Sequence, residues 1–153
     1  MPKPHKHFNS NMVINAELLK FLGKYETKRA DQRVYLIPDP EKPQTWLAYH
    51  PKNPKTTFKP KGIHAFVTHH EQNPDHPQHK KIAAWPITSH KDTFHVGLSQ
   101  FSPDLDYAGE VLFSQKGEVR HYDNASGTYN PKEEYKEQAG FPVAKFVKPT
   151  FSF

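Results

Sequence analysis

Short apolar runs, each ended by proline, glycine or a polar cluster, recur along the chain from residue 34 to residue 122. Such runs are typical of β-strands, and the prolines between them argue against a bundle of long helices, since proline breaks a helix. The run Ile63–His70 is consistent with a strand or a short helix, because periodicity does not decide over so few residues. The strands predicted on this pattern are Val34–Ile37, Trp46–Tyr49, Ile82–Ile87, Thr93–Leu98, Glu110–Phe113 and Glu118–Tyr122.

Turn chemistry joins these runs into hairpins. The proline-rich stretch Asp39–Pro43 is a turn by composition, and Lys116–Gly117 supplies the positive φ that a tight hairpin turn requires. Ser89–Asp92 separates two further strands. Pro86 predicts that its strand lies at a sheet edge or is broken there, because proline cannot donate to the ladder.

Near the N-terminus the pattern is helical. Leu18, Leu19 and Leu22 recur at helical spacing after Asn15, whose side chain can accept from the free amides of a first turn. We therefore predict a helix from Ala16 to about Tyr25.

A second helix is predicted near the C-terminus. The polar cluster Asp123–Gly127 forms a turn, after which Asn130 is a favourable N-cap and Pro131 a favourable first helical residue. Glu133 stands where a reciprocal cap would place it, and Gly140 is the expected left-handed stop.

Together these elements predict an α+β fold: a mainly antiparallel sheet of short strands, with an N-terminal helix and a short capped helix near the C-terminus. Residues 1–12 are predicted to be a flexible basic tail, and residues 13–153 a single domain. The final stretch, Phe141–Phe151, is expected to return to extended structure and close a sheet edge.

Composition narrows the classes of protein. The 153 residues include no cysteine, which excludes disulfides, thiolate zinc sites and a cysteine nucleophile. No apolar run is long enough to span a bilayer, and no secretory signal is present, so we expect a cytoplasmic protein or one exported by a route without a signal peptide. The formal charge of +5 is compatible with a nucleic acid or an acidic protein as partner.

Common nucleotide-binding and hydrolase motifs are absent from the sequence, and no cofactor is expected. Enzymes with scattered catalytic residues remain, among them metal-independent RNases and ADP-ribosyltransferases. The side chains considered for such a site are His95, Ser99, Glu110, His121, Ser126 and Tyr129. His95, expected on a strand, is a candidate acid or base with Glu110 as its partner. Turn chemistry explains Ser126 better than catalysis does, and packing with a bonded hydroxyl explains Tyr129 better.

One loop is rich in potential metal ligands, namely His69, His70, Asp75, His76 and His79. Pro74 and Pro77 prevent these side chains from sharing one helical face, so we interpret the stretch as a hydrophilic loop and predict no metal site. A metal-binding protein is a third alternative that depends on this loop.

Two basic loops are candidates for nucleic-acid binding through Lys55, Lys59, Lys61, Lys80 and Lys81. Phe58 and Trp85 lie near these lysines in the sequence and are possible stacking platforms for bases.

One stretch resembles a module that recurs in bacterial effector and polymorphic-toxin proteins. The residues that carry the resemblance are Phe94-His95, Ser99, Ala108-Gly109-Glu110, Gly117, Asn124, Ser126-Gly127, Tyr129 and Pro131. The module reads F-H-x-S, A-G-E, a glycine turn and N-x-S-G-H-Y-x-P, and the similarity covers about a third of the chain, from Thr93 to Val147. Thr128 replaces the histidine of S-G-H-Y. If that histidine is catalytic in the module, this chain is inactive or differently tuned; if the corner is a structural clasp, the change has no effect on activity.

The resemblance implies the context of a bacterial effector or toxin rather than a particular reaction. We predict a small effector or toxin-type domain that acts on a macromolecule, and the reactions to test first are ADP-ribosyl transfer and metal-independent RNA cleavage. The alternative is a non-enzymatic binding module whose basic surface engages nucleic acid or an acidic protein.

Overall fold

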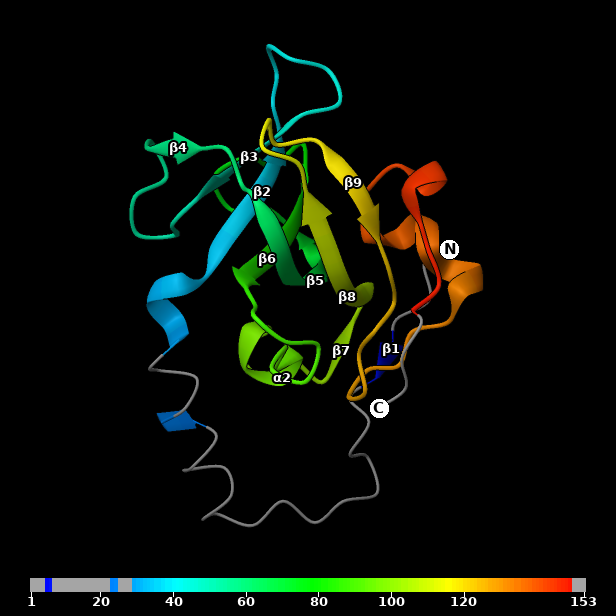
Figure 1. Ribbon diagram of the computed structural model, residues 1–153. Helices are drawn as coiled ribbons and strands as arrows, with labels where there is room; N and C mark the ends of the chain where they lie inside the picture. The colour runs from blue at the N-terminus through cyan, green and yellow to red at the C-terminus, as the bar shows by residue number, and fades with distance from the viewer. Residues whose placement is uncertain (1–4, 7–22, 25–28, 150–153) are drawn as a thin grey trace.

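A computed structural model describes residues 5–6, 23–24 and 29–149, and most of their regular structure is β (Figure 1). The main sheet has seven strands in the order β4-β3-β2-β6-β5-β8-β9, and every neighbouring pair is antiparallel. Its strands are β2 (Val34–Pro38), β3 (Trp46–Tyr49), β4 (Thr57–Phe58), β5 (Gly62–Gln72), β6 (Lys80–Pro86), β8 (Tyr107–Phe113) and β9 (Val119–Tyr122). A two-stranded sheet pairs β1 (His5–Lys6), within the predicted tail, with β7 (Asp104–Leu105).

Helices are few and short in the part of the chain that the structure describes. They include the α-helix α2 (His95–Leu98) and the 3-10 segments η2 (Ala30–Gln32), η3 (Glu133–Ala139) and η4 (Val143–Lys145). No helix among these residues has the length and apolar character needed to cross a membrane.

The predicted α+β class is therefore wrong, and the described residues form a mainly β fold. The helix predicted from Ala16 to Tyr25 lies outside the described residues, except that Gly23 and Lys24 are helical.

The predicted capped helix near the C-terminus is a 3-10 segment, η3, that begins only at Glu133 and has a non-helical residue, Tyr135, inside it. Asn130 does not cap it, because its φ of 45° places it in the left-handed region. Tyrosines of the sheet contribute to this outcome: the Tyr107 and Tyr122 hydroxyls donate to backbone carbonyls of residues 132 and 136 and so occupy acceptors that an α-helix would use.

The strand predicted at Thr93–Leu98 is also wrong, since this stretch forms α2. Phe94 has a φ of 46°, which ends any extended conformation, and its ring stacks on Trp85 at a centroid distance of 6.3 Å. A Cβ on Gly97 would lie 2.3 Å from the Phe94 ring, so only glycine leaves room for this packing. Tertiary packing thus overrides the strand propensity of the stretch.

Two of the predicted hairpins are confirmed, whereas the one around Ser89–Asp92 is not, because the helix α2 rather than a strand follows that turn. β2 pairs with β3 in the register Tyr35 to Tyr49, and β8 pairs with β9 around the turn that contains Gly117 (φ 81°). The undecided stretch Ile63–His70 is part of β5, and the strand that ends at Pro86 is not an edge strand but lies between β2 and β5.

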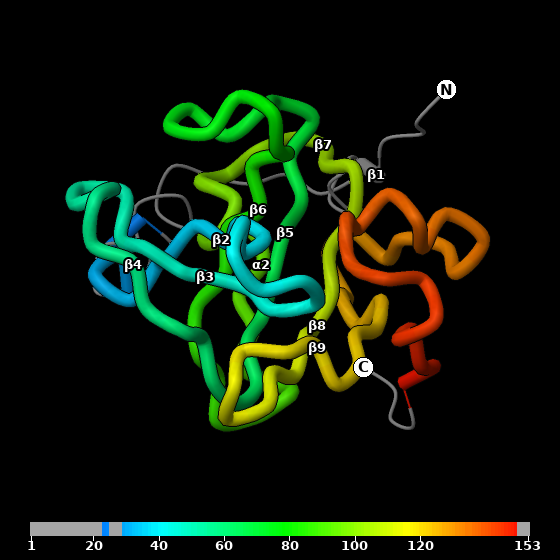
Figure 2. The backbone as a smooth tube through the Cα atoms, turned by 90° about the horizontal axis from the view of Figure 1, so that it is seen from above, coloured from blue at the N-terminus to red at the C-terminus, as the bar shows by residue number. Residues whose placement is uncertain are grey.

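The main sheet curls until its two ends meet. Thr45, just before β3, forms an antiparallel bridge with Glu118, just before β9, and the Trp46 N–H donates to the Gly117 carbonyl at 2.9 Å. Figure 2 shows the β2–β3 connection (cyan) lying against the β8–β9 hairpin (yellow). The curl gives the sheet a concave and a convex face.

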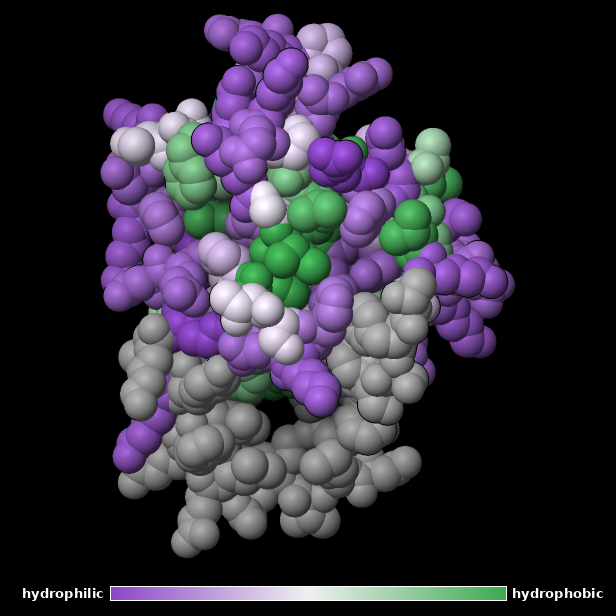
Figure 3. Space-filling model, viewed as in Figure 1, coloured by the Kyte–Doolittle hydropathy of each residue, from purple (hydrophilic) through white to green (hydrophobic). Residues whose placement is uncertain are grey.

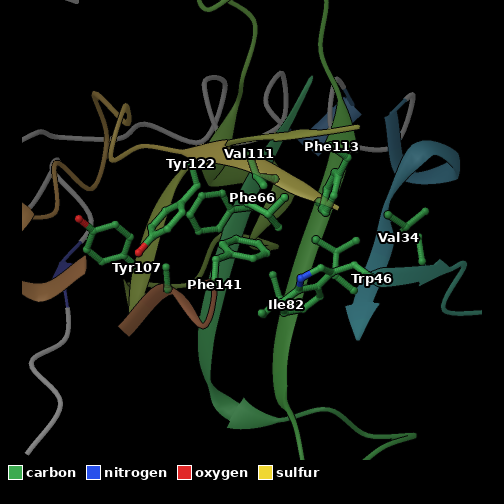
Figure 4. Packing of buried hydrophobic residues seen from close by; sticks show 14 residues of the cluster. Val34, Trp46, Phe66, Ile82, Tyr107, Val111, Phe113, Tyr122 and Phe141 are labelled. Atoms are coloured by element: carbon green, nitrogen blue, oxygen red, sulfur yellow. The ribbon is translucent and has the colours of Figure 1, made fainter. Parts of the chain in front are cut away.

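Aromatic packing fills the concave face (Figure 4). The Phe141 ring contacts Trp46, Phe66, Phe113 and Tyr122, from four different strands, at centroid distances of 5.0 to 6.5 Å. After Phe141 the chain bridges β9 in parallel at position 146, next to the edge of the sheet, as expected, but through η4 rather than a regular strand.

On the convex face, a second apolar cluster that includes Trp85, Ala108 and Tyr129 is covered by α2. Because side chains alternate along β8, Ala108, Glu110 and Leu112 belong to this face, whereas Tyr107, Val111 and Phe113 pack in the concave core. A carboxylic acid is thus built into a largely apolar face of the sheet.

Candidate active site

Glu110 occupies the middle of β8 and is 2% exposed. Asp123, the residue directly after β9, lies opposite Glu110. The Glu110 N–H donates to Asp123 Oδ1, and the Asp123 N–H donates to the Glu110 carbonyl, both at 2.9 Å. Two acidic side chains are therefore held at neighbouring positions on one face of the sheet.

His90, from the loop between β6 and α2, completes this group. Its Nδ1 lies 2.6 Å from Glu110 Oε2, and its side chain remains half-exposed. The other carboxyl oxygen, Glu110 Oε1, is buried without a hydrogen-bond partner among the described residues. A buried polar atom that lacks a partner is costly, so this oxygen is the unusual feature of the arrangement.

Burial raises the pKa of Glu110 to about 7 from its ordinary 4.5. The Asp123 carboxyl adds to the rise, since it can accept a hydrogen bond from the protonated acid and repels the ionised one, while His90 opposes it. Glu110 can therefore exist in both protonation states near neutral pH, as a general acid or base requires.

A pocket of about 340 Å³ lies at this point of the convex face. His90, Glu110 and Asp123 line it together with His121 of β9 and Lys148, whose ammonium is 3.5 Å from Glu133 Oε1 on the surface. Apolar walls come from residues that include Ile63, Leu112 and Val147. Figure 3 shows apolar surface on this side of the molecule, where Figure 1 draws β5 and β8. We call this site the Glu110 pocket.

His95 does not share this pocket. It is 2% exposed in α2, and its Nε2 lies 2.8 Å from the Gly109 carbonyl oxygen. Burial lowers the pKa of His95 to about 4, so the ring is neutral at pH 7 and donates to that carbonyl. The predicted pairing of His95 with Glu110 is wrong, because Glu110 pairs with His90.

Ser99 and Tyr129 meet beneath α2. Ser99 Oγ and the Tyr129 hydroxyl are 2.8 Å apart, the Ser102 carbonyl lies 2.7 Å from the Tyr129 hydroxyl, and the Val96 carbonyl lies 2.9 Å from Ser99 Oγ, so two hydroxyl protons serve three contacts. Ser126 accepts from the Tyr129 N–H at 3.3 Å. The hydroxyls of Ser99, Ser126 and Tyr129 thus contact backbone groups of the corner, and those of Ser99 and Tyr129 also contact each other.

Gly109 explains why these parts fit together. A Cβ at this position would lie 1.9 Å from the Asp123 carbonyl oxygen, so only glycine allows the corner after β9 to approach β8. Asn124 then fixes the corner by donating from Nδ2 to the Pro131 carbonyl at 2.9 Å. We call His95, Ser99, Gly109, Ser126 and Tyr129 the corner clasp.

The residues that suggested a bacterial effector module are thus mostly members of the corner clasp or its supports. Thr128, which replaces a histidine of that pattern, is partly exposed and does not line the Glu110 pocket. Of the three residues Ala108, Gly109 and Glu110 in this pattern, Glu110 has a buried side-chain oxygen, Oε1, without a hydrogen-bond partner among the described residues.

The histidine-rich loop distributes its side chains among separate partners. His70 contacts Asp106 and Asp104, the Tyr49 hydroxyl donates to Asp75 Oδ2 at 2.8 Å, and the His76 ring packs against Tyr49. Across residues 29–149 and the two short described pieces, no group of three such side chains is placed to hold a metal.

The basic residues fall into two groups. Lys80 pairs with Asp106 at 2.8 Å and Lys81 with Glu71 at 3.6 Å, whereas Lys55, Lys59 and Lys61 are exposed. The possible stacking platforms also separate: Trp85 is fully buried, but Phe58 is 43% exposed.

Sequence reasoning missed His90, Asp123 and Lys148. The hairpin register offered a signal for Asp123, because pairing about the Gly117 turn brings it opposite Glu110 and brings His121 opposite Leu112. His90 offered none, since only the path of the loop before α2 brings it to the pocket.

Comparison with protein-family models, with curated proteins and with solved structures finds no match to this chain. The assignment of function therefore depends on the geometry of the site.

Proposed function

We propose that this chain is a ribonuclease of the effector or toxin type that cleaves RNA by general acid–base catalysis in the Glu110 pocket. The observation that carries the proposal is the buried Glu110 carboxyl, which lines the pocket, is bonded to His90 through one oxygen and lies beside the carboxyl of Asp123. Strongly perturbed carboxyls in a cleft are typical of catalytic acids and bases.

In the proposed reaction the Glu110 carboxylate takes the proton of an RNA 2′-hydroxyl, and the 2′-oxygen attacks the adjacent phosphorus. The bond from phosphorus to the 5′-oxygen breaks, and an imidazolium gives its proton to that leaving oxygen. The products are a 2′,3′-cyclic phosphate and a free 5′-hydroxyl, so atoms and charges balance without a co-reactant.

We assign the general acid to His121 and a positioning role to His90. Glu110 and His121 are diagonal neighbours on one face of the β8–β9 pair, a relation that separates residues by about 7–8 Å in antiparallel sheets. This spacing leaves room for a phosphate between base and acid, as an in-line displacement requires. His90 holds Glu110 Oε2 at 2.6 Å and so fixes the orientation of the carboxyl at the pocket.

RNA suits the charge of the protein. A formal charge of +5 attracts a polyanion, and Lys148 in the pocket lining can offset charge that develops on the phosphate. A base with a pKa near 7 is matched to its task at neutral pH.

The direct test incubates the protein with single-stranded RNA in the presence of EDTA and measures 2′,3′-cyclic phosphate ends. We expect cleavage of RNA but not of DNA, which lacks the 2′-hydroxyl, and a loss of about 10²–10⁴-fold in Glu110→Gln. Glu118→Gln, at an exposed position on the same hairpin, is the matched control and should retain full activity. RNA cleavage that is unaffected by Glu110→Gln overturns the assignment.

ADP-ribosyl transfer is the competing reaction. An ADP-ribosyltransferase would release nicotinamide from NAD. That release would be lost in Glu110→Gln and retained in Glu118→Gln. A non-enzymatic basic binding module is the second candidate, favoured by the exposed lysines around Phe58. That function predicts RNA binding without cleavage and no effect of Glu110→Gln on affinity.

A further inference from the structure

The sheet edge at β4 combines an exposed aromatic ring with positive charge. Phe58 is 43% exposed, and its ring lies 5.7 Å from the ring of exposed His50 with an interplanar angle of 35°. The sequence from His50 to Gly62 contains four lysines and no acidic residue. None of the ion pairs within the described part of the chain involves these lysines, which are Lys52, Lys55, Lys59 and Lys61.

A pocket adjoins the ring pair. It has a volume of about 380 Å³, and His50, Lys52 and Gln100 are among its lining residues, with Asp31 on its wall. His50 is held in place through its Nδ1, 3.3 Å from the Arg33 carbonyl oxygen. The imidazole and the neighbouring phenyl ring offer two aromatic faces beside a pocket with space for a planar group.

We propose that Phe58 and His50 form a stacking subsite for a base of single-stranded RNA, with the adjacent lysines contacting its phosphates. This inference rests on the proposed function and locates where the substrate strand is held outside the Glu110 pocket. Stacking on aromatic side chains combined with a basic groove is how proteins bind single strands, because every base has a π face and every linkage a negative charge.

The chain itself connects this subsite to the Glu110 pocket. From Phe58 the backbone runs through Lys59 and Lys61 to Ile63, which lines that pocket. A Cβ on Gly117 would contact the Lys59 side chain at 3.5 Å, so this lysine lies against the β8–β9 hairpin that carries His121. A strand stacked at β4 can therefore follow the lysines toward the catalytic residues.

Lysines next to an edge strand also prevent sheets from joining edge to edge, and that role alone would explain their charge. It does not explain an exposed phenyl ring at the same edge, since an apolar ring there favours association. The two explanations differ in what they predict for Phe58.

The test measures binding in the Glu110→Gln background, where the RNA stays intact. A labelled single-stranded oligouridylate of about 12 nucleotides is titrated at several salt concentrations and followed by fluorescence anisotropy. We expect Phe58→Ala to weaken binding about tenfold without changing the salt dependence, and Phe58→Trp to retain affinity. Replacing Lys55, Lys59 and Lys61 by Gln should reduce the slope of log affinity against log salt by up to about 2.

Two controls separate stacking from general effects. Lys42→Gln changes an exposed lysine in the β2–β3 turn and should leave binding unchanged. Duplex RNA, whose bases are already stacked, should bind Phe58→Ala as it binds the unchanged chain. Unchanged single-strand affinity in Phe58→Ala, an equal loss for duplex RNA, or no RNA binding at all overturns the subsite.

The outcomes also distinguish the two proposals. If Phe58-dependent binding is found but the unchanged chain cleaves no RNA, the reaction is wrong and the subsite stands. If the chain cleaves RNA and Phe58→Ala alters neither affinity nor KM, the subsite is wrong and the reaction stands.

Discussion

The corner clasp and the Glu110 pocket both lie on the convex face beside β8, yet their polar groups have opposite environments. In the clasp, His95 donates to the Gly109 carbonyl, and Ser99 and Tyr129 bond to each other and to backbone carbonyls. One residue further along β8, Glu110 keeps a buried oxygen that has no hydrogen-bond partner among the described residues, and it shares its site with a second carboxyl and a half-exposed histidine.

This difference separates structure from chemistry within one sequence pattern. Satisfied, buried groups stabilise the corner and have no capacity left for a substrate. A buried carboxyl that is held partly unsatisfied costs free energy of folding, and such a cost is typical of functional sites. Within the pattern that resembles an effector module, most residues therefore build the corner, and we assign the reaction to Glu110.

The largest expected effect comes from breaking both regions at once. Gly109→Ala places a Cβ 1.9 Å from the Asp123 carbonyl oxygen, and no side-chain rotation relieves a clash with backbone. We expect a loss of at least about 3 kcal/mol in the free energy of unfolding, measured by urea denaturation, together with loss of RNA cleavage as Asp123 moves. A variant with unchanged stability would show that the corner does not approach β8 this closely.

The second-largest effect is a pH dependence of the free energy of unfolding that we expect from Glu110 in the pocket. The folded state binds the Glu110 proton more tightly than the unfolded chain, so this group stabilises the fold fully below pH 4.5, and that contribution is lost as the pH rises through about 7. Glutamine carries no charge at any pH, so Glu110→Gln does not lose stability as the pH rises. We expect it to be more stable than the unchanged chain by about 2 kcal/mol at pH 8, with little difference at pH 4.5.

Urea denaturation at the two pH values provides the measurement, with Glu118→Gln as the control whose stability should follow the unchanged chain. Equal stability of Glu110→Gln and the unchanged chain at pH 8 would contradict a buried, destabilised carboxylate.

The smallest effect tests the clasp alone. Tyr129→Phe removes the hydroxyl that bonds to Ser99 and to the Ser102 carbonyl, and should lower the free energy of unfolding by about 1–2 kcal/mol. Ser99→Ala should cost about 1 kcal/mol, and the double variant less than the two together, because they share one hydrogen bond. Cleavage per folded molecule should not change; a large fall in kcat would move Tyr129 into the catalytic group.

Local chemistry was enough to predict the hairpins. Asp39–Pro43 and Gly117 act through the conformations of a few adjacent residues, so the strands around them were found close to their observed limits. The predictions failed where distant groups compete with local preference. The stretch predicted as the strand Thr93–Leu98 contains α2 instead, because the Phe94 ring packs on Trp85. In the segment predicted as a capped helix, backbone carbonyls accept hydrogen bonds from the hydroxyls of Tyr107 and Tyr122 instead of from helical N–H groups.

For the candidate site, the sequence by itself determined that Glu110 stands on a strand of a tight hairpin, because alternation and turn chemistry are properties of neighbouring residues. Only the tertiary structure decided its partners. The curl of the sheet places Glu110 on a convex face. Gly109 has no side chain and so allows Asp123 to lie close to β8. The loop after β6, on the other side of β5, brings His90 within hydrogen-bonding distance of Glu110. The environment that raises the pKa of Glu110 is created by burial and by charges far apart in the chain, and these exist only once the chain has folded.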